Sequence, residues 1–172
     1  MTVAVAGQSI MVTPLTLIVA VDTLGRVPPL NDRAAALAWA DSIVGDELDA
    51  RRPEVKWVLP PEVRKVARRA PTVAPDPDRM GQSLMRDKHF TEVPDPLRED
   101  LRTLVALVGG RMALIPASVA LVPAPGGQVR AEIAMALADA RTGKVLWRTL
   151  TWGTGATPSE ALTAAMEAVL PI

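Results

Sequence analysis

Cysteine is absent from this sequence of 172 residues, and histidine occurs only once. Without cysteine the chain can form no disulfide, no thiolate metal site and no cysteine nucleophile. The single histidine leaves one candidate for a metal ligand or for a serine–histidine relay. Most familiar catalytic chemistry is therefore excluded. The sequence therefore predicts a fold class and a non-catalytic role. We expect no catalytic residue, no metal and no cofactor.

Aromatic residues are also scarce: tyrosine is absent, phenylalanine occurs once and tryptophan four times. A platform for single-stranded nucleic acid needs several aromatic faces on which bases stack, so this composition argues against one. The charges cancel, with 19 Lys and Arg against 19 Asp and Glu. Because nucleic-acid binders usually carry a basic excess over the whole domain, no nucleic-acid partner is expected.

Long hydrophobic runs are missing as well. No stretch approaches the roughly 20 apolar residues of a membrane-spanning helix, so no membrane span is expected. The first residues lack the basic region of an intact signal peptide. Ala4-Val5-Ala6 leaves two interpretations open, because it is either the stub of a removed signal peptide or the small apolar start of a strand.

What the chain does contain is a regular alternation of strand and helix patterns. Asp32 is a candidate N-cap for the first helix, and Thr157-Pro158-Ser159-Glu160 has the pattern of a capping box before the last one. Asp95 and Pro96 are expected at the N-cap and first position of another helix. The predicted strands are residues 9–12 with 15–21, 55–58, 112–122, 128–140 and 145–152, and the predicted helices are residues 33–51, 62–70, 97–108 and those after 157.

This order predicts an α/β sandwich, in which helices pack on a mixed sheet that ends in an antiparallel three-stranded meander. We expect a single domain over residues 1–172, with a proline-rich excursion at residues 71–96. One face of the strand over residues 128–140 is rich in alanine, which indicates a closely packed helix above it. Trp147 and Trp152 have opposite parity in the last strand, so one should join the core and the other should lie at the rim or face a partner.

Charge is unevenly distributed although its sum is zero. Residues 51–69 hold seven basic and two acidic residues, whereas residues 22–50 hold six acidic and two basic ones. The basic side of the helix at 62–70 is either a docking face for an acidic protein, phospholipid headgroups or nucleic acid, or a solvated face neutralised by its acidic neighbours. The candidate partner-binding residues are Arg64, Lys65, Arg68, Arg69, His89, Phe90 and Trp152.

Carboxylates stand near His89 in the sequence and as the pair Glu99-Asp100. They could in principle serve a metal site or acid–base chemistry. However, Asp76, Asp78 and Asp87 occupy positions typical of caps and turns, and the pair falls on the exposed flank of a helix. A hydrolase is therefore the least favoured hypothesis.

The hairpin Ala138-Asp-Ala-Arg-Thr-Gly-Lys-Val-Leu-Trp147 has the pattern D-x-x-T-G-x-x-x-W, with Gly143 free to take a positive φ. Together with a first strand that ends at Pro14 and the strand-to-helix junction Val58-Leu-Pro-Pro-Glu-Val63, it resembles bacterial envelope domains of the TolB N-terminal, CsgG and LpoB type. The chain lacks a lipobox cysteine, so the resemblance does not extend to a lipid anchor.

This resemblance implies an exported, non-enzymatic, membrane-extrinsic domain that docks on a larger envelope complex. Protein subunits of secretion, cell-wall synthesis, and energy-transducing or photosynthetic complexes all fit as partners, in a periplasmic or envelope-associated location. The proline-rich excursion and the basic helix are its expected contact surface. The alternative is a cytoplasmic module that binds nucleic acid or an anionic ligand through the basic helix at residues 62–70.

Overall fold

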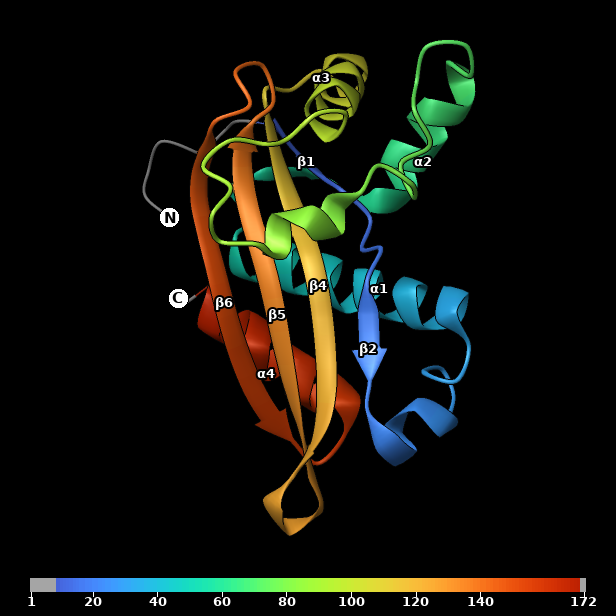
Figure 1. The fold of residues 1–172 in the computed structure, drawn as a ribbon, viewed down its shortest axis with the longest axis vertical. Helices are drawn as coiled ribbons and strands as arrows, with labels where there is room; N and C mark the ends of the chain where they lie inside the picture. The colour runs from blue at the N-terminus through green and yellow to red at the C-terminus, as the bar shows by residue number, and fades with distance from the viewer. Residues whose placement is uncertain (1–8, 171–172) are drawn as a thin grey trace.

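Six strands of the chain form one mixed sheet (Figure 1), seen in a computed structural model that describes residues 9–170. The strands are β1 (Ser9–Val12), β2 (Ile18–Ala20), β3 (Lys56–Val58), β4 (Met112–Ala124), β5 (Gln128–Asp139) and β6 (Val145–Gly155). Their order is β3-β1-β4-β5-β6, with β2 beside β4. Pairing is parallel in β1–β3, β1–β4 and β2–β4, and antiparallel in β4–β5 and β5–β6. The predicted mixed sheet and C-terminal meander are confirmed. The tripeptide Ala4-Val5-Ala6 lies outside the described residues.

Four α-helices pack on this sheet: α1 (Arg33–Arg51), α2 (Pro60–Arg69), α3 (Leu97–Val108) and α4 (Pro158–Val169). Asp32 caps α1 as predicted, because its Oδ1 accepts a hydrogen bond from the amide of Ala35 at 2.8 Å. Thr157 and Glu160 form the predicted capping box of α4. Helix α2 begins at Pro60, where the proline pair opens its first turn, and the Leu59 carbonyl accepts from the amides that follow Pro61.

The predicted cap of α3 was wrong. Pro96 itself occupies the N-cap position and the helix begins at Leu97, with no side-chain cap. Asp95 is thereby one residue too far upstream to reach the first helical amides. Its carboxylate accepts a hydrogen bond from Arg98 Nη2 at 3.1 Å instead.

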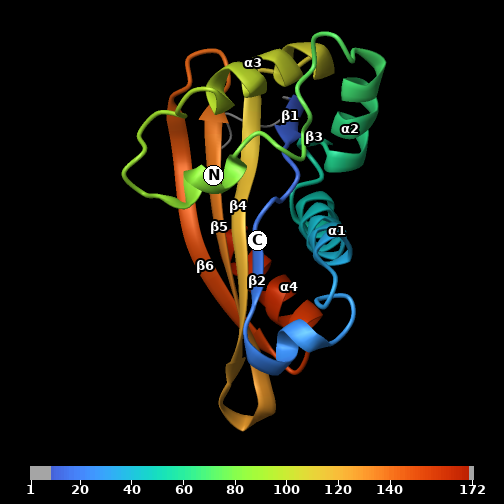
Figure 2. The same cartoon turned by 45° about the vertical axis from the view of Figure 1, so that its right-hand side comes forward.

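The two faces of the sheet are covered to different extents. Helices α1 and α4 lie behind it (Figures 1 and 2), and the side chains of β5 that face them are buried from Val129 to Leu137. In front, α3 and the short 3-10 helix η3 (Gln82–Arg86) cover Ala134, Ala136 and Ala138. The predicted helical cover of the alanine face therefore exists, but only over the half of the sheet that is uppermost in Figure 1.

The proline-rich excursion at residues 71–96 crosses the front of the sheet (Figure 2). Its buried side chains are Pro77, Met80, Gln82, Met85 and Val93. Gln82 Nε2 donates hydrogen bonds to the carbonyl groups of Pro14 at 3.2 Å and Pro77 at 2.6 Å. From β6, Arg148 donates to the carbonyl groups of Met85, Asp87 and Phe90 at 2.6 to 2.8 Å. The excursion is thus a packed layer that covers part of the core.

Strand β6 is longer than predicted and ends at Gly155 instead of Trp152. Gly153 lies within it, opposite Ala131 of β5. A Cβ atom at Gly153 would lie only 2.3 Å from the Ala165 amide nitrogen of α4. The glycine that suggests a loop in the sequence therefore lets α4 pack directly on the backbone of β6.

Candidate functional site

The lower half of the front face of the sheet is bare (Figure 1). Below η3, strands β2, β4, β5 and β6 carry no helix on this side, and the view in Figure 2 agrees. The strand register places one row of side chains across this surface: Val19, Ala120, Glu132 and Trp152. Leu150 lies in the next row towards η3, beside Ala134. We call this surface the bare face.

Large apolar side chains on the bare face remain in contact with solvent. Trp152 is 56% exposed, Leu150 53% and Val19 45%. Val21, which follows β2, is 38% exposed. Single exposed apolar residues are normal on protein surfaces. Here Trp152 and Leu150 are neighbours on β6, and Val19 and Val21 are neighbours at β2.

Two charged residues accompany these apolar side chains. The Arg130 guanidinium carbon lies 5.0 Å from the centroid of the Trp152 ring, which is within the range of a cation–π contact. Glu132 lies directly opposite Trp152 in the ladder between β5 and β6. Neither Arg130 nor Glu132 forms an ion pair with any of residues 9–170. The bare face thus carries exposed apolar side chains at β6 and at β2, with one unpaired charge of each sign on β5 between them.

The two tryptophans of β6 divide as the parity predicts. Trp147 packs against the core behind the sheet, whereas Trp152 points to the bare face. That Trp152 contacts a partner remains a prediction. Sequence reasoning missed Leu150 and Val19, although Leu150 shares the parity of Trp152 and could have been found by that signal.

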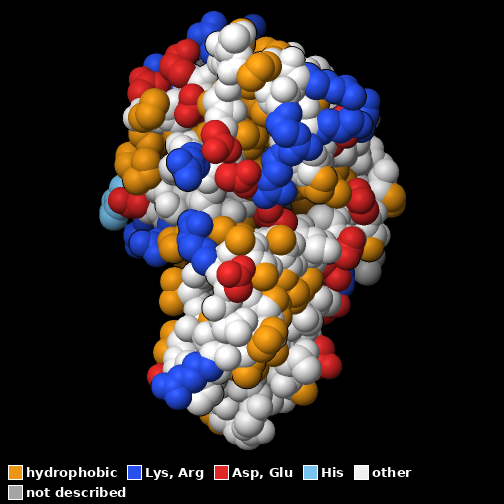
Figure 3. All heavy atoms as spheres, turned by 90° about the vertical axis from the view of Figure 1, so that its right-hand side faces the viewer, with side chains coloured by type: hydrophobic (Ala, Val, Ile, Leu, Met, Phe, Trp, Pro, Cys, Tyr) orange, Lys and Arg blue, Asp and Glu red, His pale blue; other side chains and the backbone are white. Residues whose placement is uncertain are grey.

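The basic side of α2 is partly neutralised (Figure 3). Arg64 Nη2 lies 2.8 Å from Asp78 Oδ1 and 3.1 Å from Asp41 Oδ2. Lys65 Nζ lies 3.5 Å from Glu62 Oε2. Arg68 and Arg69 are exposed and make no ion pair within the part of the chain that the structure describes. The solvated-face interpretation therefore fits Arg64 and Lys65, while two cations of the helix stay uncompensated.

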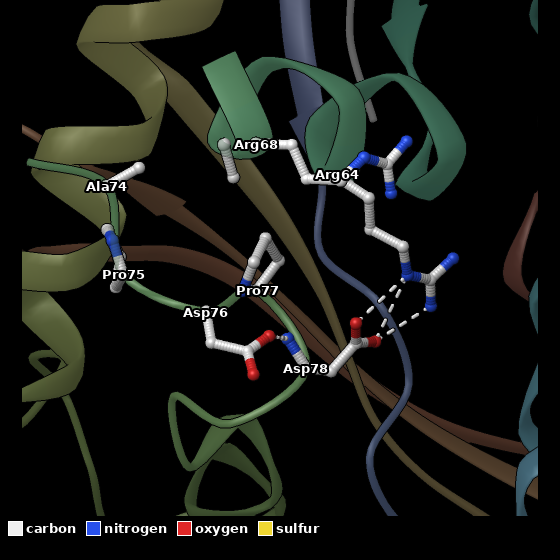
Figure 4. A pocket seen from close by; sticks show the side chains of 8 residues that line it. Arg64, Arg68, Ala74, Pro75, Asp76, Pro77 and Asp78 are labelled. Atoms are coloured by element: carbon white, nitrogen blue, oxygen red, sulfur yellow. Dashed lines mark hydrogen bonds and ion pairs between the residues drawn. The ribbon is translucent and has the colours of Figure 1, made fainter. Parts of the chain in front are cut away.

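Arg64 also joins α2 to the core. Burial raises the pKa of Asp41, and hydrogen bonds from the Leu15 amide at 2.8 Å and from Arg64 partly offset this. Bonding to Asp78 raises the pKa of Arg64, so the guanidinium stays charged. A hollow of about 390 Å³ lies beside it, lined by residues of both signs, including Arg68 and Asp76 (Figure 4). In Figure 4, Arg68 makes no bond to the other residues drawn.

His89 and Phe90 lie apart from α2. His89 is exposed, and its Nδ1 lies 2.8 Å from Asp87 Oδ1. The His89 amide and ring both bond Asp87 and lower the pKa of its carboxyl group. Phe90 packs against the core in front of the sheet. The predicted site residues therefore fall in three separate places, namely α2, the excursion and β6.

Between residues 9 and 170, no three His, Asp or Glu side chains gather closely enough to hold a metal ion. Within the same range, no helix combines the length and the apolar character needed to cross a membrane.

Several solved structures are similar to this chain. The LpoB C-terminal domain from Salmonella enterica is 13% identical, with a TM-score of 0.48 over 90% of this chain and 87% of that chain. A PelC dodecamer from Paraburkholderia phytofirmans is 16% identical, with a TM-score of 0.49 over 96% of this chain and 86% of that one. Lipoprotein GNA1162 from Neisseria meningitidis is 17% identical, with a TM-score of 0.41 over 87% and 82% of the two chains.

No protein-family model matches the sequence, and no curated protein matches it significantly. LpoB is one of the three proteins that the hairpin pattern of residues 138–147 suggested. The resemblance to TolB and CsgG stays a prediction. At these levels of identity, the likeness says nothing of what the chain binds.

Proposed function

We propose that this chain is a non-enzymatic, membrane-extrinsic subunit of the bacterial envelope, which docks on a larger protein complex through its bare face. The observation that carries this proposal is the exposure of Trp152 and Leu150 on β6, and of Val19 on β2, on the same half of one sheet face. Sheets in α/β proteins bury their apolar faces under helices, and here the cover stops halfway. The hairpin pattern of residues 138–147 supports the envelope location.

The dimensions of the bare face favour a single helix of a partner protein as its occupant. It spans four strands, or about 14 Å at a spacing of about 4.8 Å, and a similar length along each strand. The resulting area, about 200 Å², is far below the roughly 800 Å² that each partner buries in a standard protein interface. A helix is about 10 Å wide, so two to three turns cover the surface.

The charges of the bare face define the chemistry of that helix. Its apolar side should pack on Trp152 and Leu150, with an acidic side chain near Arg130. A basic side chain near Glu132 would complete the complementarity. If the occupant were a second copy of this chain, the helix would have to come from that copy's own surface. Purification would then give a dimer of this chain instead of a complex with another protein.

The basic helix is a weaker candidate for the main docking site. Arg64 and Lys65 are already paired with carboxylates of this chain. Only Arg68 and Arg69 remain available to a partner.

The proposal is tested by purifying the tagged protein from gently solubilised membranes of the native cell. We expect a stoichiometric complex with wild type that is lost with Trp152→Ser, because truncating an interface tryptophan removes a large share of the binding energy. Val73→Ser is the matched control, since Val73 is exposed but lies in the excursion. A complex that survives Trp152→Ser, or a wild-type protein found only as a free monomer, would refute the docking role. If only dimers of this chain are found, the occupant of the bare face is a second copy of the chain and not a helix of another protein.

A further inference from the structure

A hollow with three arginines lies at the end of the molecule that is uppermost in Figure 1. Its volume is about 410 Å³, and it lies between α3, the start of β4 and the turn from β5 to β6. Its walls include Arg102, Val105, Ala106, Arg111, Ala140 and Arg141. We call it the arginine hollow. Its volume falls within the range of about 300 to 1,000 Å³ that is typical of small-molecule sites.

Hydrogen bonds fix the side chain of Arg111 relative to the backbone of Arg141. Arg111 Nε and Nη2 donate to Asp139 Oδ2 at 2.9 and 2.6 Å. The other oxygen of Asp139 accepts from the amide of Arg141 at 2.9 Å. The amide of Ala140 donates to the Arg111 carbonyl at 3.0 Å. The turn that carries Arg141 is therefore tied to the strand that carries Arg111 before any ligand arrives.

The charge of the arginine hollow is not balanced. Asp139 pairs with Arg111, but Arg102 and Arg141 form no ion pair with any residue that the structure describes. Glu99, one turn before Arg102 on α3, makes no ion pair with it either. About two positive charges thus remain at a hollow whose floor is apolar, formed by Val105 and Ala140, both of which are buried.

We infer that the arginine hollow binds a phosphate monoester. Such a group carries a charge of about −1.5 to −2 near neutral pH and offers three strong acceptor oxygens. It can therefore accept from several guanidinium groups at once, and guanidinium matches phosphate oxygens in a bidentate geometry. The apolar floor can receive the organic part of the ligand. Either a soluble phosphate ester or a lipid headgroup that is a phosphate monoester supplies this chemistry.

The two sources are separated by two probes, glycerol 3-phosphate in solution and phosphatidylcholine vesicles with or without phosphatidic acid. We expect wild type to bind at least one probe, and Arg102→Gln/Arg141→Gln to weaken that binding at least tenfold. Arg68→Gln/Arg69→Gln is the matched control, because it removes two exposed, unpaired arginines from α2. Binding to glycerol 3-phosphate would indicate a soluble ligand, and binding only to vesicles with phosphatidic acid a membrane surface.

Three results would overturn the inference: no binding of either probe, equal loss in the control variant, or binding that the double variant retains. Amide chemical shifts of the wild-type protein give a second readout that needs no variant. Glycerol 3-phosphate or short-chain phosphatidic acid should shift the amides around residues 102–111 and 139–142. Shifts centred elsewhere would place the ligand outside the arginine hollow.

Discussion

At the scale of single residues, Asp139 is the most densely bonded carboxylate of the fold. Its side chain is buried, and it accepts from Arg111 and from the amides of Arg141 and Thr142. Burial alone raises the pKa of Asp139, but these bonds outweigh it and the pKa is lowered. A lowered pKa in the folded state means that the ionised carboxylate stabilises the fold above its unfolded pKa. This stabilisation is lost as the pH falls through the folded value.

Asp139→Asn should therefore destabilise the protein at pH 7, and less at pH 3, which lies below the ordinary pKa of an aspartate. The amide oxygen can still accept from the turn, but the charge-assisted bonds with Arg111 are lost, which costs about 1–3 kcal/mol. Urea unfolding at the two pH values measures the difference. The control is Asp95→Asn, an exposed carboxylate paired with Arg98, with an expected change below about 0.5 kcal/mol. An equal effect of Asp139→Asn at both pH values would contradict this account.

Residues whose partners lie close in sequence were the predictable ones. Asp32 and Thr157 cap helices three residues away, so their roles can be read from local pattern. Gln82 and Arg148 bond groups more than fifty positions away, at Pro14 and Met85 respectively. No local pattern indicates such contacts, so the sequence alone does not predict that the excursion packs on the core.

At the scale of elements, the packing of α4 on β6 depends on glycine. A Cβ atom at Gly153 would meet the backbone of Ala164 and Ala165 at 2.3 to 2.5 Å, so the helix would have to move. The sequence could predict both elements, because α4 has a capping box and β6 alternates in polarity. It could not predict their separation, since the approach of two elements depends on the fold that brings them together.

Gly153→Ala is expected to lower the free energy of unfolding by about 1–3 kcal/mol, as is usual when a well-packed contact is overfilled. Thr154→Ala is the control, because Thr154 is exposed and its side chain points to the opposite face of β6. Chemical denaturation of both variants measures the effect. A Gly153→Ala variant as stable as the control would mean that α4 does not rest on the β6 backbone.

At the scale of the whole molecule, the central feature is the unequal cover of the sheet. Odd positions of β5 are buried along its length, whereas its even positions change from alanine to Glu132 and Arg130 where the front cover ends. This change is visible in the sequence, but its meaning depends on the register that brings Trp152 and Val19 into the same row. The strand order and register thus place apolar residues that are distant in the sequence on one candidate docking surface.

The most direct test of that surface is site-specific photocrosslinking in native membranes. A photoreactive amino acid at Leu150 should crosslink to one partner protein, and the crosslinked peptide should be an amphipathic helix that carries an acidic residue. The same probe at Val73, which is 66% exposed, should give little product. Absence of a crosslink at position 150, or equal yields at both positions, would contradict the claim that the bare face docks a partner.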